Sequence, residues 1–180
     1  QPALVRERGE NLTVVYTPLN GAGAMPVGRA LSELGIRVTF VPEQEKPDGN
    51  FPTVKFPNPE EASAMKLALE LGKAKKADLV MGTDPDADRI GIAAPDAEGF
   101  RLITGNELGA LLVDYVLSTR KTLGTLPQNG IVIKTIVTSE LQRLIAESHG
   151  VRCMDVLTGF KYIGEKIREV FKVQVVDIVL

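Results

Sequence analysis

Short apolar runs alternate along the chain with stripes of apolar residues at helical spacing. Short, mainly apolar runs of strand length occur at residues 12–16, 36–41, 78–82, 90–94, 131–133 and 151–156, and residues 172–180 are predicted as one more strand. Apolar residues at three- and four-residue intervals predict five helices, whose apolar stripes begin at Val27, Ala62, Leu108, Leu141 and Phe160. Strands that alternate with helices in this way are typical of βαβ units with parallel strands.

The alternation runs through the chain twice, once before Thr104 and once after it. We therefore predict an α/β fold class, with two consecutive three-layer α/β/α-type units whose sheets are mixed but largely parallel. The first unit is expected over residues 1–104. The second unit, over residues 105–180, is expected to be incomplete.

Two of the helices carry further signals. Asn58 is expected to cap the helix that follows it, with Pro59 at the first helical position and Glu61 as the acid of a capping box. The stripe from Leu108 to Val116 recurs at helical spacing and is predicted to face the core. Residues 42–59 form a long, proline-rich loop, and a loop of this length inside a compact unit is usually functional or packed on the surface.

Composition and charge exclude several classes of protein. Of the 180 residues, 44% are apolar and 24% are charged, which is ordinary for a globular protein. The net charge of −2 argues against a chain-wide electrostatic grip on nucleic acid, and no run approaches the ~20 apolar residues of a membrane span. Cys153 is the single cysteine, which excludes an internal disulfide. We expect a reduced, cytoplasmic setting with this thiol buried in a strand.

The segment from Thr83 to Arg89 carries the densest candidate chemistry. Asp84, Asp86 and Asp88 alternate after the end of an apolar strand, and alternate side chains of an extended loop point the same way. Three carboxylates at one place repel unless a cation neutralises them, and an all-oxygen set suits a hard ion such as Mg²⁺ or Ca²⁺. Arg89, beside that cation, has the chemistry to hold a phosphate oxygen.

Other interpretations of this segment are weighed by position. A solvated acidic turn stays open, because Asp and Pro are common turn residues. An EF-hand loop would need glycine at position 89 and glutamate at position 95, where the chain has Arg89 and Pro95. An aspartyl-phosphate phosphatase also begins with Asp-x-Asp after a strand, although Asp88 departs from that pattern.

The decapeptide from Gly82 to Gly91 resembles the metal-binding loop of the α-D-phosphohexomutases, the phosphoglucomutase/phosphomannomutase family. Three further segments resemble that family in the same order along the chain: residues 17–23, residues 47–52 together with 57–60, and residues 158–163. The resemblance covers the family's second domain and part of its third. It implies an enzyme of carbohydrate metabolism that moves phosphate from the 1-position to the 6-position of a hexose. In that family a phosphoserine gives its phosphoryl group to the hexose phosphate, and the bisphosphorylated sugar then returns its other phosphoryl group to the serine.

The resemblance also implies a cofactor and its ligands. Mg²⁺ is the implied ion, carried by Asp84, Asp86 and Asp88, and Arg89 is implied to contact the transferring phosphoryl group. Phosphoryl transfer fits this set, since it depends on positioning and charge neutralisation more than on covalent help from the protein.

The third-domain segment implies the sugar contacts. Thr158 and Gly159 are implied to contact the sugar, and Lys161 is a weaker candidate. Thr158 can equally be the cap of the helix that follows. The implied partners are hexose 1- and 6-phosphates, the bisphosphate intermediate and the remaining domains of the same enzyme, with neither nucleic acid nor membrane among them.

Two family segments are absent from the sequence. The phosphoserine loop is missing, and residues 172–180 do not resemble the Gly-Glu-Glu-Ser segment of the third domain. We therefore expect the 180-residue chain alone to be inactive as a mutase, and the sugar stays open among glucose, mannose, glucosamine and pentose phosphates. The alternatives are a non-catalytic module that binds metal or sugar phosphate on the same fold, and an Asp-based phosphatase.

Overall fold

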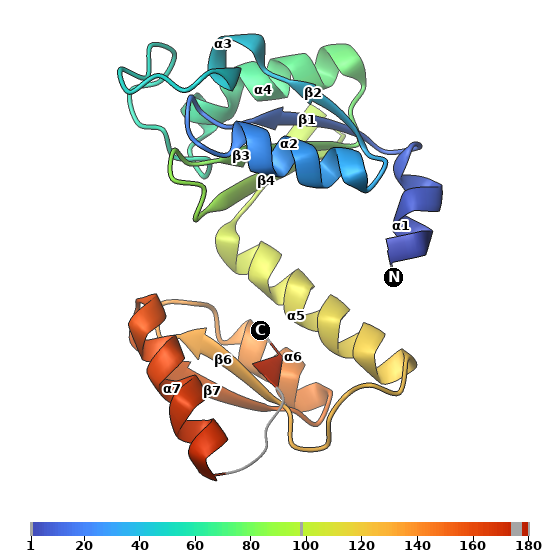
Figure 1. The fold of residues 1–180 in the computed structure, drawn as a ribbon, viewed down its shortest axis with the longest axis vertical. Helices are drawn as coiled ribbons and strands as arrows, with labels where there is room; N and C mark the ends of the chain where they lie inside the picture. Colours follow the sequence, from blue (N-terminus) through green and yellow to red (C-terminus); the bar gives the residue numbers. More distant parts are fainter. Residues whose placement is uncertain (1, 98, 174–177, 180) are drawn as a thin grey trace. The chain divides into compact units, whose positions relative to one another are not determined.

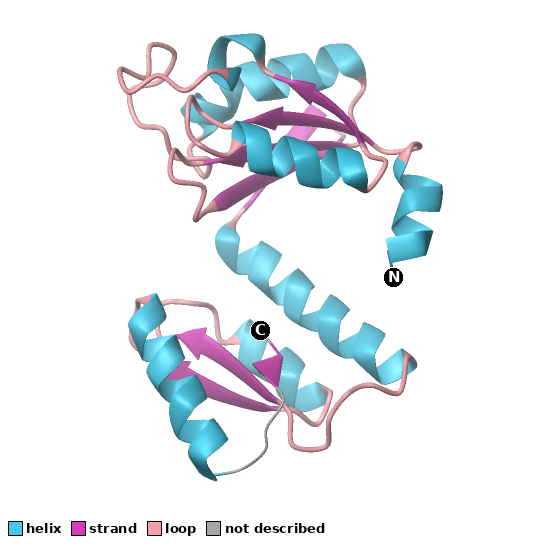
Figure 2. Ribbon diagram, viewed as in Figure 1, coloured by secondary structure: helices cyan, strands magenta, loops and turns pink. Residues whose placement is uncertain are grey.

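The computed structural model describes residues 2–97, 99–173 and 178–179, and the chain forms two compact units, residues 1–105 and 106–180 (Figure 1). Unit 1 contains α1 (Pro2–Gly9), β1 (Thr13–Thr17), α2 (Ala24–Glu33), β2 (Arg37–Phe40), α3 (Pro42–Glu45), α4 (Ala62–Lys75), β3 (Leu79–Thr83), β4 (Ile90–Asp96) and β5 (Gly99–Ile103). Helix α5 (Gly105–Thr122) leads into unit 2, which continues with β6 (Ile131–Thr135), α6 (Leu141–Ser148), β7 (Arg152–Val156), α7 (Phe160–Val173) and β8 (Ile178–Val179). The predicted α/β fold class is confirmed (Figure 2).

The sheet of unit 1 has the strand order β2-β1-β3-β4-β5. Strand β1 pairs in parallel with β2 and β3, whereas β3–β4 and β4–β5 are antiparallel. Because β1 and β3 are parallel neighbours, the loops that follow them leave the sheet at the same edge. Strand β5 was not predicted, because residues 99–103 are neither continuously apolar nor regularly alternating.

Both faces of this sheet are covered by helices. Val15 of β1 packs in one cluster with Met65 and Ala68 of α4. Successive side chains alternate between the faces of a strand, so Tyr16 lies on the other face, where its ring meets Phe40 edge-on at 5.5 Å. Gly28 of α2 lies against that Phe40 ring, since an added Cβ would come within 2.6 Å of it. The fold therefore buries β1 from both sides, as a parallel strand requires.

Helix α4 begins later than its capping signals predict. Its first residue is Ala62, and Glu61 precedes it in an extended conformation with no side-chain cap. The Asn58 carboxamide oxygen instead accepts the Glu60 amide at 3.0 Å, which closes an Asx turn outside the helix. The prediction of a capping box over residues 58–61 is therefore wrong, because a local turn satisfies the cap residue first.

Helix α5 turns a different face inward from the one its apolar stripe predicts. Leu111, Leu112 and Tyr115 are 61%, 52% and 67% exposed, so the prediction that these three face the core is wrong. The buried positions of α5 are Ala110, Val113 and Leu117. Spacing alone identifies an amphipathic helix, but here Val113 and Leu117, with Val116 beside them, pack against α6 and the sheet.

Unit 2 has a parallel sheet with the order β7-β6-β8. One cluster joins Val113 and Leu117 of α5 to Val132, Ala146, Val151 and Cys153, which confirms the predicted burial of the cysteine. A second cluster joins Ile131, Ile133 and Val156 to α7 on the other face. Residues 174–177 and 180, in the predicted strand 172–180, lie outside the described residues. None of the described helices combines the length and apolar content that a bilayer crossing demands.

Candidate metal centre and sugar loop

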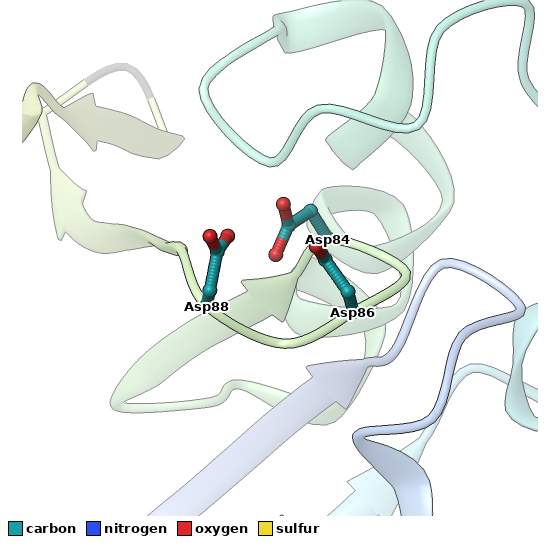
Figure 3. A group of neighbouring side chains, drawn as sticks. All are labelled: Asp84, Asp86 and Asp88. Atoms are coloured by element: carbon teal, nitrogen blue, oxygen red, sulfur yellow. The ribbon is translucent and has the colours of Figure 1, made fainter. Parts of the chain in front are cut away.

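The acidic loop, residues 84–88, follows directly from the end of β3. It is a tight turn rather than the extended loop that the sequence suggests. The Ala87 amide donates to the Asp84 carbonyl at 3.0 Å, and Ala87 has a left-handed φ of +59°. The turn brings oxygens of Asp84, Asp86 and Asp88 within 4.8 Å of one another (Figure 3). Chain reversal, and not strand alternation, therefore gathers the three carboxylates.

The three carboxylates differ in exposure and in partners. Asp84 is 1% exposed, whereas Asp86 and Asp88 reach solvent. Arg89 supports Asp84 twice, because its Nε donates to Oδ2 at 2.8 Å and its backbone amide donates to Oδ1 at 3.1 Å. The Arg89 Nε also lies 3.8 Å from Asp88 Oδ1. The Arg89 guanidinium therefore fixes the buried carboxylate of Asp84. The carboxylates of Asp86 and Asp88 face solvent, where a ligand can reach them.

The charges of the loop shift its pKa values in opposite directions. Burial acts to raise the pKa of Asp84, but the hydrogen bonds from Arg89 outweigh it and hold that pKa below its ordinary value. Repulsion from Asp86 raises the pKa of Asp88, with burial and Asp84 adding to it. Asp84 is therefore ionised at neutral pH, and a bound cation would remove the repulsion that raises the pKa of Asp88.

Close packing under the loop leaves no room for side chains at two glycines. The Tyr16 hydroxyl hydrogen-bonds the Thr83 hydroxyl at 2.8 Å, immediately before Asp84. A Cβ on Gly23 would come within 2.4 Å of that Tyr16 oxygen. A Cβ on Gly91, the residue after Ile90 at the start of β4, would come within 2.2 Å of a main-chain oxygen of the segment that precedes α4. Close packing at Gly23 and Gly91 therefore fixes β3 and β4, the strands on either side of the acidic loop.

A cavity of about 660 Å³ opens beside the acidic loop. Its lining combines carboxylates, an arginine and an apolar rim: Phe56, Pro57, Asn58, Glu61, Asp84, Pro85, Asp86 and Arg89. Phe56 is 66% exposed at this rim. Sequence reasoning assigned Asn58 and Glu61 to a helix cap and did not predict Phe56 here. The available signal for this side of the cavity was the long loop predicted over residues 42–59, of which residues 42–45 form α3.

The predicted sugar contacts lie in unit 2, whereas the acidic residues lie in unit 1. Thr158 and Gly159 lie between β7 and α7, and Lys161 lies in the first turn of α7. Thr158, Gly159 and Lys161 are all exposed. Gly159 has a left-handed φ of +127°, and its carbonyl accepts the Tyr162 amide at 3.0 Å in the first turn of α7. Lys161 extends its ammonium over the Tyr162 ring at 4.6 Å. Because α7 begins at Phe160, Gly159 and not Thr158 precedes the helix directly.

An ion cluster around a buried lysine in unit 2 was not predicted from the sequence. Lys134, at the end of β6, has a side chain only 2% exposed and contacts Glu140 at 2.8 Å and Asp155 at 2.9 Å. Arg143 also contacts both carboxylates and donates to the Cys153 carbonyl at 2.9 Å. A lysine directly after the predicted strand of residues 131–133 was the available signal.

Comparisons with known proteins match the chain in two parts. The family model described as phosphoglucomutase/phosphomannomutase, alpha/beta/alpha domain II, matches residues 1–99, and the corresponding domain III model matches residues 104–174. A phosphoglucomutase of Staphylococcus aureus (strain N315) is 40% identical over 161 residues, which cover 88% of this chain and 28% of that protein. A Schizosaccharomyces pombe protein named "Probable phosphoribomutase" is 38% identical over 165 residues, 91% of this chain and 28% of its own length.

Solved structures share the fold. A phosphoglucomutase/phosphomannomutase family protein from Burkholderia thailandensis superposes with a TM-score of 0.71 at 21% identity, over 93% of this chain and 35% of that one. The N-acetylphosphoglucosamine mutase of Aspergillus fumigatus, solved with GlcNAc-6P and magnesium, gives a TM-score of 0.60 at 19% identity, over 93% and 36% of the two chains. The chain thus spans about a third of these structures and 28% of the curated relatives.

Proposed function

Because the chain belongs to the phosphoglucomutase/phosphomannomutase family, as its motifs predicted, we propose that it supplies the cation-binding and sugar-binding middle of a phosphohexomutase. The observation that carries the proposal is the convergence of Asp84, Asp86 and Asp88 at the end of β3, beside Arg89. The reaction moves phosphate between the 1- and 6-positions of a hexose: a phosphoserine from outside this sequence gives its phosphoryl group to the hexose phosphate, and the other phosphoryl group of the resulting bisphosphorylated sugar returns to the serine.

The donor set fits Mg²⁺. Three carboxylates within 4.8 Å of one another offer oxygen ligands of the kind that hard divalent cations prefer. Such an ion supplies charge neutralisation to a phosphoryl group in transfer. The exposed outer carboxylates leave that side of the site open to a ligand, while buried Asp84 anchors it.

Arg89 has two tasks in this proposal. Its Nε bond to Asp84 fixes the buried carboxylate, which orients the first ligand. Its side chain is still 54% exposed and lines the cavity beside the loop, so the rest of the guanidinium can meet a phosphate oxygen there. The residue therefore links cation and phosphate without leaving the loop.

Thr158, Gly159 and Lys161 are the proposed sugar contacts. Their support is membership of the family together with exposure at the C-terminal end of β7, where α/β sheets bind ligands. The sugar is left as a hexose or pentose phosphate. The relatives include a phosphoglucomutase and a "Probable phosphoribomutase", so similarity at this level does not single out one sugar.

The proposed phosphoserine does not lie in this sequence, so we propose that the 180-residue chain alone binds Mg²⁺ but does not isomerise glucose 1-phosphate. Thermal unfolding with and without Mg²⁺ tests the binding. A rise in Tm for the native chain, abolished in Asp86→Asn and kept in Glu70→Gln on α4, is expected; an equal rise in all three would overturn the assignment of the ligands.

A coupled assay tests the chemistry with the same chain. Neither isomerisation nor phosphate release from glucose 1-phosphate is expected. Release of phosphate that depends on Mg²⁺ and is lost in Asp84→Asn would favour an Asp-based phosphatase. Isomerisation that scales with the concentration of the chain would overturn the requirement for a serine from elsewhere.

A further inference from the structure

The turn that follows β1, residues 17–23, holds two consecutive residues in a costly conformation. Leu19 and Asn20 have left-handed φ values of +47° and +59°, and both are buried, at 0% and 5% exposure. A left-handed residue other than glycine costs roughly 1–2 kcal/mol, less for Asn. Such residues persist where the surroundings fix them, and they cluster at functional sites. The conformation of this β1 turn therefore points to a role in positioning a functional site.

Asn20 ties the β1 turn to α3 and the segment after it. Its Nδ2 donates to the Glu43 carbonyl at 3.2 Å and to the Lys46 carbonyl at 2.9 Å. Among the described residues, its Oδ1 is the buried side-chain oxygen that lacks a hydrogen-bond partner. Rotating the amide would set that oxygen against two carbonyls, so the orientation is forced. The Asn20 side chain thus fixes the turn against the Glu43 and Lys46 carbonyls, although its Oδ1 has no hydrogen-bond partner.

A second buried bond chain reinforces the same attachment. The Thr17 hydroxyl donates to Gln44 Oε1 at 2.7 Å, and Gln44 Nε2 donates to the Thr53 hydroxyl at 3.0 Å. Gln44 is 0% exposed, and its carbonyl accepts the Asn20 amide at 2.8 Å. The β1 turn is therefore anchored on the side away from the acidic loop.

On its other side the β1 turn presses against the backbone of the acidic loop. The Ala22 amide donates to the Pro85 carbonyl at 2.8 Å. A Cβ on Gly21 would come within 2.3 Å of Pro85 Cα, so only glycine permits this approach. Pro85 lies between Asp84 and Asp86, and the place of its backbone sets the separation of these two carboxylates.

We propose that Asn20 and Gly21 are positioning residues for the acidic loop: the first fixes the β1 turn, and the second lets that turn seat Pro85. The cation is the ligand for which the loop is positioned, so this inference rests on the proposed function. Neither residue touches the cation or the phosphate. Groups that orient metal ligands in this indirect way typically change metal affinity about 10–100-fold when they are removed.

The first test measures the dissociation constant of Mg²⁺ by calorimetry on the full 180-residue chain. Gly21→Ala is expected to weaken binding at least about tenfold. Asn20→Gly keeps the left-handed backbone but loses both side-chain bonds, and is expected to weaken binding in the same direction. Gly49→Ala is the matched control, because an added Cβ there meets nothing within 4 Å, and its affinity should equal that of the native chain.

The second test needs no metal. Hydrogen exchange of the Ala87 and Arg89 amides, which both bond to Asp84, reports the conformation of the loop directly. Gly21→Ala and Asn20→Gly should raise these two rates at least about tenfold relative to the amides of β3, and Gly49→Ala should not.

The outcomes separate this inference from the proposed function. Faster loop exchange in a chain that binds no Mg²⁺ would remove the metal proposal and leave the positioning role in place. Unchanged loop exchange with unchanged affinity would overturn the positioning role. Loss of stability spread evenly over β1 and β3, with native Mg²⁺ affinity in Asn20→Gly, would also overturn it, because the turn would then serve only the fold.

Discussion

Replacing Lys134 with methionine removes a buried ammonium group from the end of β6 and keeps most of the side chain's volume. Three acceptors each lose one donor: the Thr138 carbonyl at 3.3 Å, Glu140 at 2.8 Å and Asp155 at 2.9 Å. Methionine fills the same space, so packing changes little and the result isolates the ion cluster.

The size of the effect follows from exposure. Removing one partner of a fully buried pair costs about 3–5 kcal/mol, because the other charge stays buried without compensation. Here Asp155 and Glu140 reach solvent, at 34% and 67% exposure, and both keep Arg143, so we expect about 1–2 kcal/mol for Lys134→Met. A unit of this size has a stability of about 4–11 kcal/mol, so the loss should lower its Tm by about 5–15 °C.

Urea unfolding, with hydrogen exchange of the β6 and β7 amides to assign the change to unit 2, measures this loss. Lys166→Met is the matched control, because Lys166 contacts the 65%-exposed Glu169, and an exposed pair contributes about 0–1 kcal/mol. Equal losses in the two variants, or a gain in Lys134→Met, would refute the reasoning that burial makes the Lys134 cluster costly to break.

Three further predictions concern pH, thiol reactivity and packing. The hydrogen bond from Lys134 holds the pKa of Asp155 below its ordinary 3.8. The stability that this carboxylate adds is therefore complete above that value and is lost as the pH falls below it. Urea midpoints measured between pH 5 and about 3 should fall less in Lys134→Met than in the native chain. Burial raises the pKa of the Cys153 thiol, so a thiol reagent should label the native chain at least about 100-fold more slowly than the urea-unfolded chain, and similar rates would contradict the buried placement. Gly72→Ala should cost about 1–3 kcal/mol of unfolding free energy, because its Cβ would come within 2.6 Å of a β3 side chain, whereas Gly49→Ala should stay within about 0.5 kcal/mol of the native value; equal values in urea titrations would contradict the packing described for α4.

The apolar runs predicted most strands of the fold. Strands β1, β3 and β7 begin and end within one residue of the predicted runs. For β1 and β3 the reason is that a strand covered on both faces has a nearly continuous apolar sequence. Strand β5 was not predicted, since its pairing with β4 comes from a hairpin that a five-residue segment with Arg101 does not signal.

Helix faces and starts were harder to predict than strands. Asn58 has the residue type of a cap, but the Glu60 amide lies closer than the start of α4. Leu111 and Tyr115 have the spacing of a core stripe, yet Ala110 and Leu117 are the residues that pack inward. Which face is buried depends on the shape of the neighbouring elements, which no local pattern contains.

The acidic loop shows what spacing can and cannot predict about a site. The alternation of aspartates over residues 84–88 indicated a carboxylate cluster, and their oxygens do lie together. The mechanism was different, because the reversal depends on left-handed Ala87 and on bonds that return to Asp84. The support from Gly21 could not be predicted, since it joins residues about 64 positions apart that meet only after β1 and β3 pair.

Paramagnetic relaxation with Mn²⁺ is the most direct test of the central claim, that the acidic loop binds a divalent cation. Mn²⁺ shares the oxygen ligands of Mg²⁺ and broadens the amide resonances nearest to it. The account predicts that Asp86, Ala87 and Arg89 broaden first, that excess Mg²⁺ restores them, and that Asp86→Asn removes the effect. Broadening centred on another acidic surface, or none at millimolar Mn²⁺, would contradict the cation site on which the proposed function rests.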